Sequence, residues 1–523
     1  MRQLPLFDRR SIVLSALFMF LIILISGSAG VYILSDKSLQ EAFYFINFAF
    51  RLEEYYPGRL DWERMLTSAR NAMFDQLDRY SGYMESRQFE QLDEELGGSY
   101  GGIGVTVVDH EQGLLIMSVR ENGPAAEVGL LSGDVIIATD DINLAGMNSE
   151  RATRLLRGRE GTRVKVAVFR PVLNDTLTVT ITRRQVDLLH VPFAGFTPDS
   201  MLYIRVLDFE AGTTRDIKNA LDSLLGRKDM RPRGIILDLK GNPGGLFNEA
   251  YHTANLFLDK GRFIVGTRGR SRWKEEKHYS SGRDITGGLP LAVIIDGGSA
   301  SSAEIVSGAL RQLKRAVLIG DTTFGKGLVQ GFTRFPDGSG LRLTISRYYL
   351  EGNVYLNEFD TALNEVGRGL PPDYYFPFTE RQLFCRQLEN SLILQQFANL
   401  HQEDIIQQSE NFELDDRWVK TFEEYAKKNN FNFTSPRTQI AELLLDLSHL
   451  EGRSPEIRQK AGQILKISRE SDMRKFYEYG SYIKIRLRQL AYERKFGIYR
   501  TYADVIIRSR PDIRLSAQIL KEQ

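Results

Sequence analysis

Short apolar runs alternate with amphipathic segments through the middle of the chain. Residues 291–296 (LAVIID) and 316–320 (AVLIG) are rich in branched apolar side chains, which is typical of buried parallel strands. Between them, residues 303–313 place apolar side chains at helical spacing. Two parallel strands joined by a crossover helix form a right-handed unit in nearly all proteins, so both strands end at the same edge of the sheet. We therefore expect the loops after these two strands to lie close together.

A third buried strand is predicted at residues 234–240 (GIILDLK), and it leads directly into the loop GNPGG at residues 241–245. A helix is predicted after this loop, over residues 246–258. Ligand sites in open parallel sheets lie at the carboxyl ends of the strands. The pattern therefore predicts an α/β core with three loops gathered at one site.

Two residues in these loops are candidates for chemistry. Ser301 lies in GSASSAE (residues 298–304) at the predicted start of the helix, and Lys326 lies in FGKG (residues 324–327) after the next strand. A serine hydroxyl becomes a good nucleophile when a base takes its proton. A lysine can be that base if burial between apolar neighbours such as Phe324, Leu328 and Val329 lowers its pKa from about 10.4. We predict a Ser–Lys peptidase in which the Gln330 amide orients the lysine, although each motif alone is typical of a helix cap or a turn.

An oxyanion hole is predicted beside the serine. Such a site needs backbone N–H donors aimed at the reacting carbonyl oxygen, and one donor is worth about 2.7–4 kcal/mol. Glycines allow the backbone to approach a substrate closely. The predicted donors are the amide of Gly244 or Gly245 and the amide of Ser302, which follows the nucleophile.

These motifs resemble the carboxyl-terminal processing, or tail-specific, serine peptidases. The resemblance extends from about residue 39 to residue 378, and its blocks occur in the family's order. They are residues 69–96, a PDZ-like segment, LDLKGNPGG (237–245), GSASSAE (298–304) and TFGKGLVQ (323–330). The resemblance implies a multidomain α/β fold. Its parts are a crotonase/ClpP-like catalytic core, an inserted PDZ-like β domain and helical regions at both ends.

The resemblance also implies roles for single residues. Ser301 corresponds to the nucleophile, Lys326 to the general base and Gln330 to the third member of the site. The chain departs from the family at two places. Ser302-Ala303 inverts the end of the usual SASASE motif, and Gln312 stands where some members carry an aspartate.

The PDZ-like segment extends over residues 97–186 and opens with a glycine-rich turn into a strand. Gly101, Gly102, Ile103, Gly104 and Val105 form this turn and are the candidate peptide-binding residues. PDZ domains add a peptide to a sheet edge and hold its terminal carboxylate with backbone amides. The predicted partners are therefore unfolded or tailed proteins bound through their C-termini. Without the family, the same glycines would indicate ordinary hairpin turns.

The domain boundaries follow from these segments. We expect an anchor or signal sequence at 1–35, a helical region at 36–96 and the PDZ-like domain at 97–186. The catalytic domain follows at 187–378, and a helical region at 379–523 ends the chain. The last region has amphipathic stretches such as residues 440–450 and 482–496. It is expected either to mediate assembly into a homo-oligomer or to cover the chain's own core.

The first 35 residues predict export. Residues 11–35 are uncharged and mostly apolar, which is long enough to cross a bilayer. Arg2, Arg9 and Arg10 precede them and favour a cytoplasmic N-terminus. We expect a single-pass inner-membrane protein with its catalytic part in the periplasm. The alternative is a signal peptide that is cleaved near residues 26–29 and releases the enzyme into the periplasm.

Composition narrows the function further. The 523 residues carry 68 basic and 67 acidic side chains, for a net charge of +1, so nucleic-acid binding has no electrostatic footprint. The six histidines are scattered without an HExxH motif, and Cys385 is the single cysteine, so we expect no metal and no cofactor. A triad that uses a histidine stays open, because its members can be distant in sequence. Two other function classes remain, a catalytically silent peptide-binding scaffold and an envelope chaperone.

Overall fold

The computed structural model describes residues 37–96, 99–120, 123–171, 173–187, 189–270, 275–361, 364–378, 382–409, 414–451 and 455–522. The chain divides into two compact units, residues 1–76 and 77–523. The described part of the first unit contains helices α2 (Lys37–Tyr55) and α3 (Trp62–Phe74). The Asp61 carboxylate caps α3 by accepting a hydrogen bond from the Arg64 amide. Both helices fall within the region that was predicted to be helical.

The predicted membrane segment, residues 11–35, lies outside the described residues. From residue 37 onward, no described helix is long and apolar enough to span a bilayer. Helix α2 nevertheless exposes a set of large apolar side chains: Phe43, Tyr44, Phe45, Ile46, Phe48 and Phe50. The anchor and the cleaved signal both stay predictions.

The α/β core of the second unit is built on a six-stranded sheet in the order β10-β11-β12-β15-β16-β22. All neighbours are parallel except β10, which is antiparallel at one edge. The strands are β10 (Phe193–Phe196), β11 (Leu202–Arg205), β12 (Ile235–Asp238), β15 (Leu291–Ile295), β16 (Val317–Gly320) and β22 (Tyr374–Tyr375). The three strands predicted from apolar runs are confirmed as β12, β15 and β16, which are neighbours in that order.

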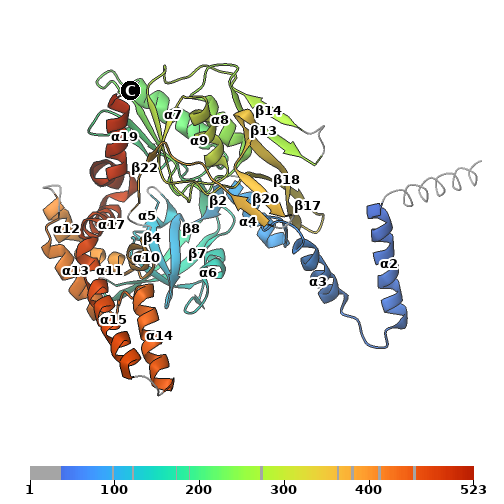
Figure 1. Ribbon diagram of the computed structural model, residues 1–523, viewed down its shortest axis with the longest axis horizontal. Helices are drawn as coiled ribbons and strands as arrows, with labels where there is room; N and C mark the ends of the chain where they lie inside the picture. The colour runs from blue at the N-terminus through green and yellow to red at the C-terminus, as the bar shows by residue number, and fades with distance from the viewer. Residues whose placement is uncertain are drawn as a thin grey trace, which may run out of the picture. The chain divides into compact units, whose positions relative to one another are not determined.

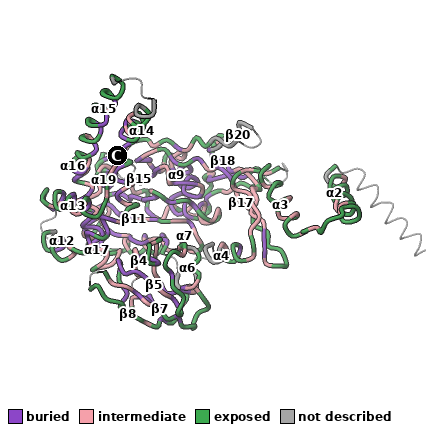
Figure 2. The backbone as a smooth tube through the Cα atoms, turned by 90° about the horizontal axis from the view of Figure 1, so that it is seen from below, coloured by how far each residue is buried: buried purple, intermediate pink, exposed green. Residues whose placement is uncertain are grey.

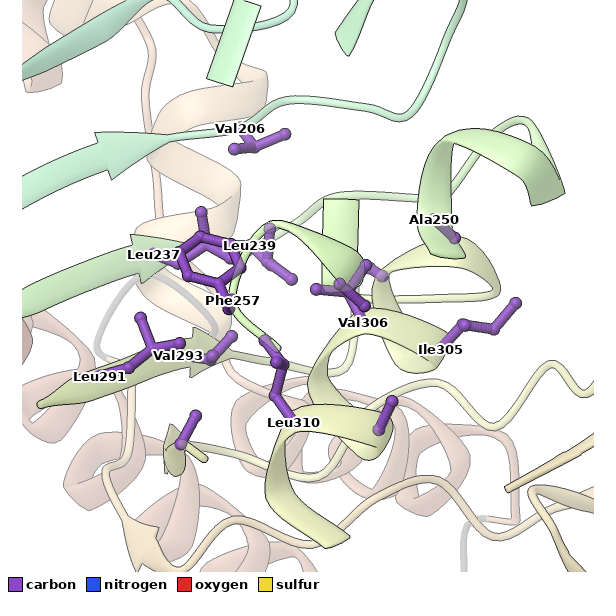
Figure 3. Close-up of a cluster of buried hydrophobic side chains, with 14 of the residues drawn as sticks. Val206, Leu237, Leu239, Ala250, Phe257, Leu291, Val293, Ile305, Val306 and Leu310 are labelled. Atoms are coloured by element: carbon purple, nitrogen blue, oxygen red, sulfur yellow. The ribbon is translucent and has the colours of Figure 1, made fainter. Parts of the chain in front are cut away.

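Helices cover both faces of this sheet (Figure 1). One face carries α7 (Thr213–Leu225), α8 (Phe247–Asn255) and α9 (Ser302–Gln312), and the other carries α19 (Pro511–Glu522). Side chains alternate between the faces because the strand period is two. Leu237 and Val293 therefore pack with α8 and α9 (Figure 3), whereas Ile236 and Ile294 pack with α19. Strand β15 is buried along its whole length and α9 over most of it (Figure 2).

A second sheet flanks the core in the order β1-β18-β13-β14, and β17 and β19 also pair with β18. Its strands are β1 (Gly82–Met84), β13 (Phe263–Gly269), β14 (Glu276–Tyr279), β17 (Leu328–Arg334), β18 (Gly340–Leu350) and β19 (Val354–Tyr355). A turn η2 (Glu351–Asn353) joins β18 to β19, and a ribbon of β20 (Asn357–Thr361) and β21 (Asn364–Gly367) follows. Strand β1 lies in the stretch that was predicted to be helical. Its pairing with β18 joins segments about 260 residues apart.

The inserted β domain has a sheet in the order β3-β4-β5-β7-β8, with β6 paired to β5. Its strands are β3 (Val105–His110), β4 (Gly113–Val119), β5 (Val135–Thr139), β6 (Ile142–Asn143), β7 (Arg163–Arg170) and β8 (Asp175–Thr182). Its helices are α5 (Pro124–Glu127) and α6 (Ser149–Leu156), and α4 (Ser86–Leu96) precedes the domain. Strands β2 (Ser99–Gly102) and β9 (Arg184–Asp187) pair with each other at the entry and exit of the domain.

The C-terminal region is helical, as predicted. It comprises α10 (Leu383–Asn390), α11 (Ile393–Leu400), α12 (Gln402–Ser409), α13 (Arg417–Lys428), α14 (Pro436–Glu451), α15 (Pro455–Met473), α16 (Lys475–Glu478), α17 (Gly480–Thr501), η4 (Tyr502–Ile506), α18 (Ile507–Ser509) and α19. Arg510, just before α19, pairs with the fully buried Asp238 of β12 at 2.6 Å. The end of this region, with α19, therefore packs on one face of the α/β sheet, which is the covering alternative for its last helix.

Candidate active site

Ser301 lies at the junction of β15 and α9, at the carboxyl edge of the parallel sheet. Its backbone has φ +52° and ψ −114°. Residues other than glycine rarely adopt such a conformation, which costs about 1–3 kcal/mol and is common at functional sites. The side chain is half-buried. A serine is thus held in a strained turn at a helix N-terminus, the arrangement expected of an exposed nucleophile.

A buried carboxylate, Glu304, joins the serine turn to the lysine loop. Glu304 Oε2 accepts hydrogen bonds from the amides of Ser301 (2.8 Å) and Lys326 (2.9 Å). Its Oε1 accepts from the Thr323 hydroxyl (2.5 Å) and the Gly325 amide (2.8 Å). Burial raises the pKa of Glu304, although these four hydrogen bonds act in the opposite direction. The structure therefore brings Ser301 and Lys326 together through their backbones.

Lys326 lies in the loop between β16 and β17 and is half-buried. The Tyr348 hydroxyl binds the Lys326 carbonyl and also lies 3.2 Å from the Ser301 carbonyl. Because Tyr348 is 1% exposed, this second bridge is also inside the protein. The Lys326 ammonium lies over the Tyr80 ring, 4.8 Å from its centroid. Phe324, expected to bury the lysine, is 46% exposed, whereas Leu328 is buried.

A second lysine near this edge of the sheet also has a perturbed pKa. Burial, with the nearby charge of Arg510, lowers the pKa of Lys240 to about 8. Its ammonium lies 4.5 Å from the centroid of the Phe378 ring, which packs on the face covered by α19. Lys240 therefore lies on the opposite side of the sheet from α9, and it serves as a control for the role of Lys326.

Gln330 lies on β17 and is anchored through one end of its amide. Its Nε2 donates to the Thr344 hydroxyl at 2.8 Å. Its Oε1 is buried and has no hydrogen-bond partner in the described ranges of the chain. A buried acceptor without a donor costs about 1–3 kcal/mol, so this oxygen is a candidate acceptor for a further polar group. The prediction that Gln330 orients Lys326 stays a prediction.

The GNPGG loop lies directly against the serine turn. Gly244 has φ +99°, and a Cβ placed there would lie 2.8 Å from Ser301 Cβ and 2.9 Å from the Ser302 amide. The Gly244 amide donates to Asn242 Oδ1 at 2.9 Å, so of the two predicted glycines Gly245 is the better oxyanion donor. Among the described residues, the amides of Gly245 and Ser302 have no hydrogen-bond partner. The Ser302 hydroxyl donates to the Gly245 carbonyl at 3.0 Å and fixes the two loops together.

The predicted peptide-binding turn lies at the free edge of the inserted domain. Strand β3 is the edge strand of its sheet, and α6 packs beside it. Ile103 is buried, and its carbonyl accepts the Ala125 amide at 2.9 Å. The amides of Ile103 and Gly104 have no hydrogen-bond partner in the described part of the chain. The turn thus presents unused N–H groups next to an open sheet edge, which is what capture of a peptide C-terminus requires.

Comparison with known proteins decides the family. Residues 200–374 match the model of peptidase family S41, and residues 101–182 match the PDZ domain. Carboxy-terminal processing protease CtpA of Bacillus subtilis is 32% identical over 365 residues, which are 68% of this chain and 76% of that protein. The chain belongs to peptidase family S41. A carboxy-terminal-processing protease of Bartonella bacilliformis is 31% identical over 62% of this chain and 72% of its own.

Among solved structures, the photosystem II D1 C-terminal processing protease is 26% identical, with a TM-score of 0.37. The match between the two covers 62% of this chain and 86% of the chain in that structure. The S41 chain is a serine peptidase with a PDZ domain, and the predicted fold class is confirmed. The domain boundaries and the roles of single residues stay predictions.

Several residues of the S41 site were not predicted as such. Glu304 lies in the GSASSAE motif but had no assigned role, and the signal was a charged residue in the first turn of a helix, followed mostly by apolar residues. Tyr80 lay inside a quoted block, and Tyr348 had no signal at all. Gln312, which replaces the aspartate of some members, is the last residue of α9. It lies at the opposite end of that helix from Ser301, about 16 Å away at 1.5 Å per residue.

Proposed function

We propose that this S41 peptidase cleaves proteins selected by their C-terminal tails, with Ser301 as nucleophile and Lys326 as general base. The observation that carries the proposal is the Glu304 carboxylate, which binds the amides of both residues. The strained turn at Ser301 and the unused amides of Gly245 and Ser302 support it further.

The proposed chemistry assigns one step to each of these groups. Neutral Lys326 takes the proton of the Ser301 hydroxyl as the oxygen attacks the scissile carbonyl. The amides of Gly245 and Ser302 stabilise the negative oxygen of the tetrahedral intermediate. The Lys326 ammonium then gives its proton to the leaving amine, and an acyl-enzyme remains on Ser301. In the second half of the reaction, Lys326 takes a proton from the water that attacks the ester. The bond to the Ser301 oxygen then breaks, the lysine returns the proton to that oxygen, and the new C-terminus is released.

The test uses the full-length protein and an unfolded substrate protein with an apolar C-terminus. Ser301→Ala and Lys326→Ala should each abolish cleavage while the circular dichroism spectrum is retained. Lys240→Ala is the matched control, because it removes a lysine of depressed pKa from the same edge of the sheet. It should leave kcat within a few-fold of the parent. Cleavage that survives Lys326→Ala would show that another residue is the base.

His190 is the strongest rival base. Its Nδ1 lies 2.5 Å from Asp208 Oδ1. Phe209, which follows Asp208, donates its amide hydrogen to the Gly244 carbonyl, so this segment is bonded to the GNPGG loop. Burial opposes protonation of His190, but the hydrogen bond to Asp208 together with the negative charges of Asp208, Asp216 and Glu210 raises its pKa. Only the neutral form of a histidine can act as a base, and a raised pKa leaves less of that form. His190→Gln should therefore retain most of the activity, and a loss as large as that of Lys326→Ala would favour a Ser–His site.

We propose that the segment Gly101–Val105 captures the substrate C-terminus, as an added strand along β3. Deletion of residues 97–186 should then reduce cleavage of a tailed protein much more than hydrolysis of a short peptide. Equal losses on both substrates would contradict recruitment by this domain. Binding without cleavage by the parent and by Ser301→Ala would instead favour a silent scaffold.

We further propose export to the periplasm through residues 11–35, either anchored or cleaved. Its support is the apolar composition of that segment and the three arginines before it. Protease added outside spheroplasts should digest the enzyme if it is anchored, and N-terminal sequencing separates anchor from cleaved signal. Protection from the added protease would contradict export.

Self-association through the helical regions is the remaining partner proposal. It is supported by an exposed apolar stripe on α14 formed by Ile440, Leu443, Leu444 and Leu447. Light scattering of Leu443→Glu should then report a lower mass than the parent. A monomeric parent would contradict this proposal.

A further inference from the structure

The loop of residues 78–81 is fixed against β18 by a compact set of hydrogen bonds. Asp78 Oδ1 accepts the amides of Tyr80 (3.0 Å) and Ser81 (3.1 Å), and Asp78 Oδ2 accepts the Ser81 hydroxyl (2.9 Å). The Ser81 hydroxyl oxygen in turn accepts the Thr344 amide at 3.0 Å. The loop also carries Tyr80, whose ring lies under the Lys326 ammonium. One short loop therefore touches both the lysine and the strand opposite Gln330.

A β-bulge places Gln330 opposite Thr344. Leu328 pairs with Arg347 and Val329 with Ser346, but Gln330 pairs with Thr344 instead of the next residue in register, Ile345. Bulges of this kind re-aim side chains and are frequent beside active sites. Here the shift gives the Gln330 amide a threonine hydroxyl as its neighbour, in place of an exposed isoleucine.

The direction of each hydrogen bond can be assigned from the groups involved. Asp78 Oδ1 already accepts two backbone amides, so it is also the acceptor for the Thr344 hydroxyl at 3.0 Å. A hydroxyl has one proton, so the Thr344 oxygen is left with only its acceptor sites for Gln330. It can therefore bind only the NH2 end of the amide, at 2.8 Å. The other end, Oε1, is the buried acceptor without a partner among the described residues.

We infer that Asp78 and Thr344 are positioning residues that lock the Gln330 amide with its oxygen as the acceptor for Lys326. The inference rests on the proposed role of Lys326 as the base. When the lysine takes the serine proton, the fixed oxygen accepts from the new ammonium. If the amide were reversed, its NH2 group would donate to the lone pair of the neutral amine, and that lone pair could no longer take the proton of Ser301.

We call the hydrogen bonds from Asp78 through Thr344 to Gln330 the relay. The relay should have a signature in the pH dependence of kcat. A hydrogen bond to the charged form of a group favours that form, so the fixed Gln330 oxygen raises the pKa of Lys326. Thr344→Val removes the acceptor that holds the NH2 end, and the amide becomes free to reverse. We expect kcat to fall about 10-fold and the acidic limb of the pH profile to move to lower pH by about one unit. A loss of packing alone would lower kcat and leave the limb in place.

The experiment measures kcat and KM of the full-length protein from pH 5 to 9 with an internally quenched peptide that has an apolar C-terminus. Thr344→Ser keeps the hydroxyl and should restore both kcat and the limb. Thr333→Val, an exposed threonine of β17, is the matched control and should leave both unchanged. Gln330→Glu presents an acceptor oxygen at either end and adds a negative charge, so the acidic limb of this variant should move to higher pH. A carboxylate has no wrong orientation, so adding Thr344→Val to Gln330→Glu should not shift the acidic limb any further.

The outcomes separate this inference from the proposed function. A limb that stays in place in Thr344→Val overturns the relay, whatever happens to kcat, and so does a failure of Thr344→Ser to restore it. If Thr344→Val does not fold, an unmoved limb in Gln330→Glu overturns the relay instead. Activity that survives Lys326→Ala overturns the proposed function and the relay with it. Loss of activity in Lys326→Ala with unmoved limbs overturns the relay alone.

Discussion

Replacement of Glu304 by glutamine should weaken the site by an amount that follows from its four hydrogen bonds. A glutamine has one acceptor oxygen, so its NH2 end must face one of the two pairs of donors. The pair of the Thr323 hydroxyl and the Gly325 amide is less costly to face, because the hydroxyl can turn to accept. Glu304→Gln then leaves the buried Gly325 amide without an acceptor, which costs about 1–3 kcal/mol of stability.

The alanine variant of Glu304 should lose more stability than the glutamine variant. Glu304→Ala leaves all four donors without their acceptor, and about 1 kcal/mol or more for each gives a loss of at least about 4 kcal/mol. Whole domains are stable by only about 5–15 kcal/mol, so this variant should be close to unfolded. In Glu304→Gln the amides of Ser301 and Lys326 stay bound, and kcat/KM should fall about 10-fold.

Urea unfolding tests the predicted loss of stability, and kcat/KM on the unfolded protein substrate tests the predicted loss of activity. Glu389→Gln is the matched control, because this carboxylate accepts hydrogen bonds from Tyr482 and Arg486 in the helical C-terminal region. It should lose stability while the folded fraction keeps its kcat/KM. A Glu304→Gln protein as stable and as active as the parent would refute the view that this carboxylate holds the two loops together.

Three further predictions concern separate parts of the structure. Gly244→Ala should abolish activity, because its Cβ would lie 2.8 Å from the Cβ of Ser301. Gly241→Ala has open space around it and should cost only the backbone strain of φ +68°. Melting curves and kcat/KM of the two variants check this. His190 has a raised pKa, so its contribution to the free energy of unfolding is full below about pH 6.5 and is lost as the pH rises through the folded pKa. Urea unfolding from pH 5 to 9 should show this decline in the parent and not in His190→Gln. Arg510→Met leaves the buried Asp238 with one fewer counter-charge and should cost about 3 kcal/mol in urea unfolding, with kcat of the folded protein retained.

The sequence allowed the centre of the fold to be predicted because its signals are local. The strands β12, β15 and β16 are uninterrupted apolar runs bounded by glycine, and the connection between β15 and β16 can take only one hand. That rule alone places the loops of Ser301 and Lys326 at one edge of the sheet. The helix α8 was predicted to extend to residue 258, but it ends at Asn255.

The parts that could not be predicted depend on long-range contacts. Strand β1 was assigned to a helical stretch, since three residues carry no strand period and its partner β18 lies about 260 residues away. Helix α19 gave no sign that it packs on the second face of the core. Phe324 was expected to bury the lysine on hydrophobicity alone, yet its side chain is exposed. Tyr348 is an aromatic residue in a strand, and nothing in the sequence indicates that its hydroxyl reaches two loops.

The buried polar residues around the site share one property, which explains why they are there. The side chains of Glu304, Tyr348, Ser302 and Asn242 each bind backbone groups of neighbouring segments. Irregular loops inside a protein need such partners, because buried backbone groups without hydrogen bonds are costly. Since these four side chains satisfy the loops, the amides of Gly245 and Ser302 can remain free for a substrate. A polar residue on an apolar helix such as α9 therefore stabilises the loops and leaves the reacting groups uncommitted.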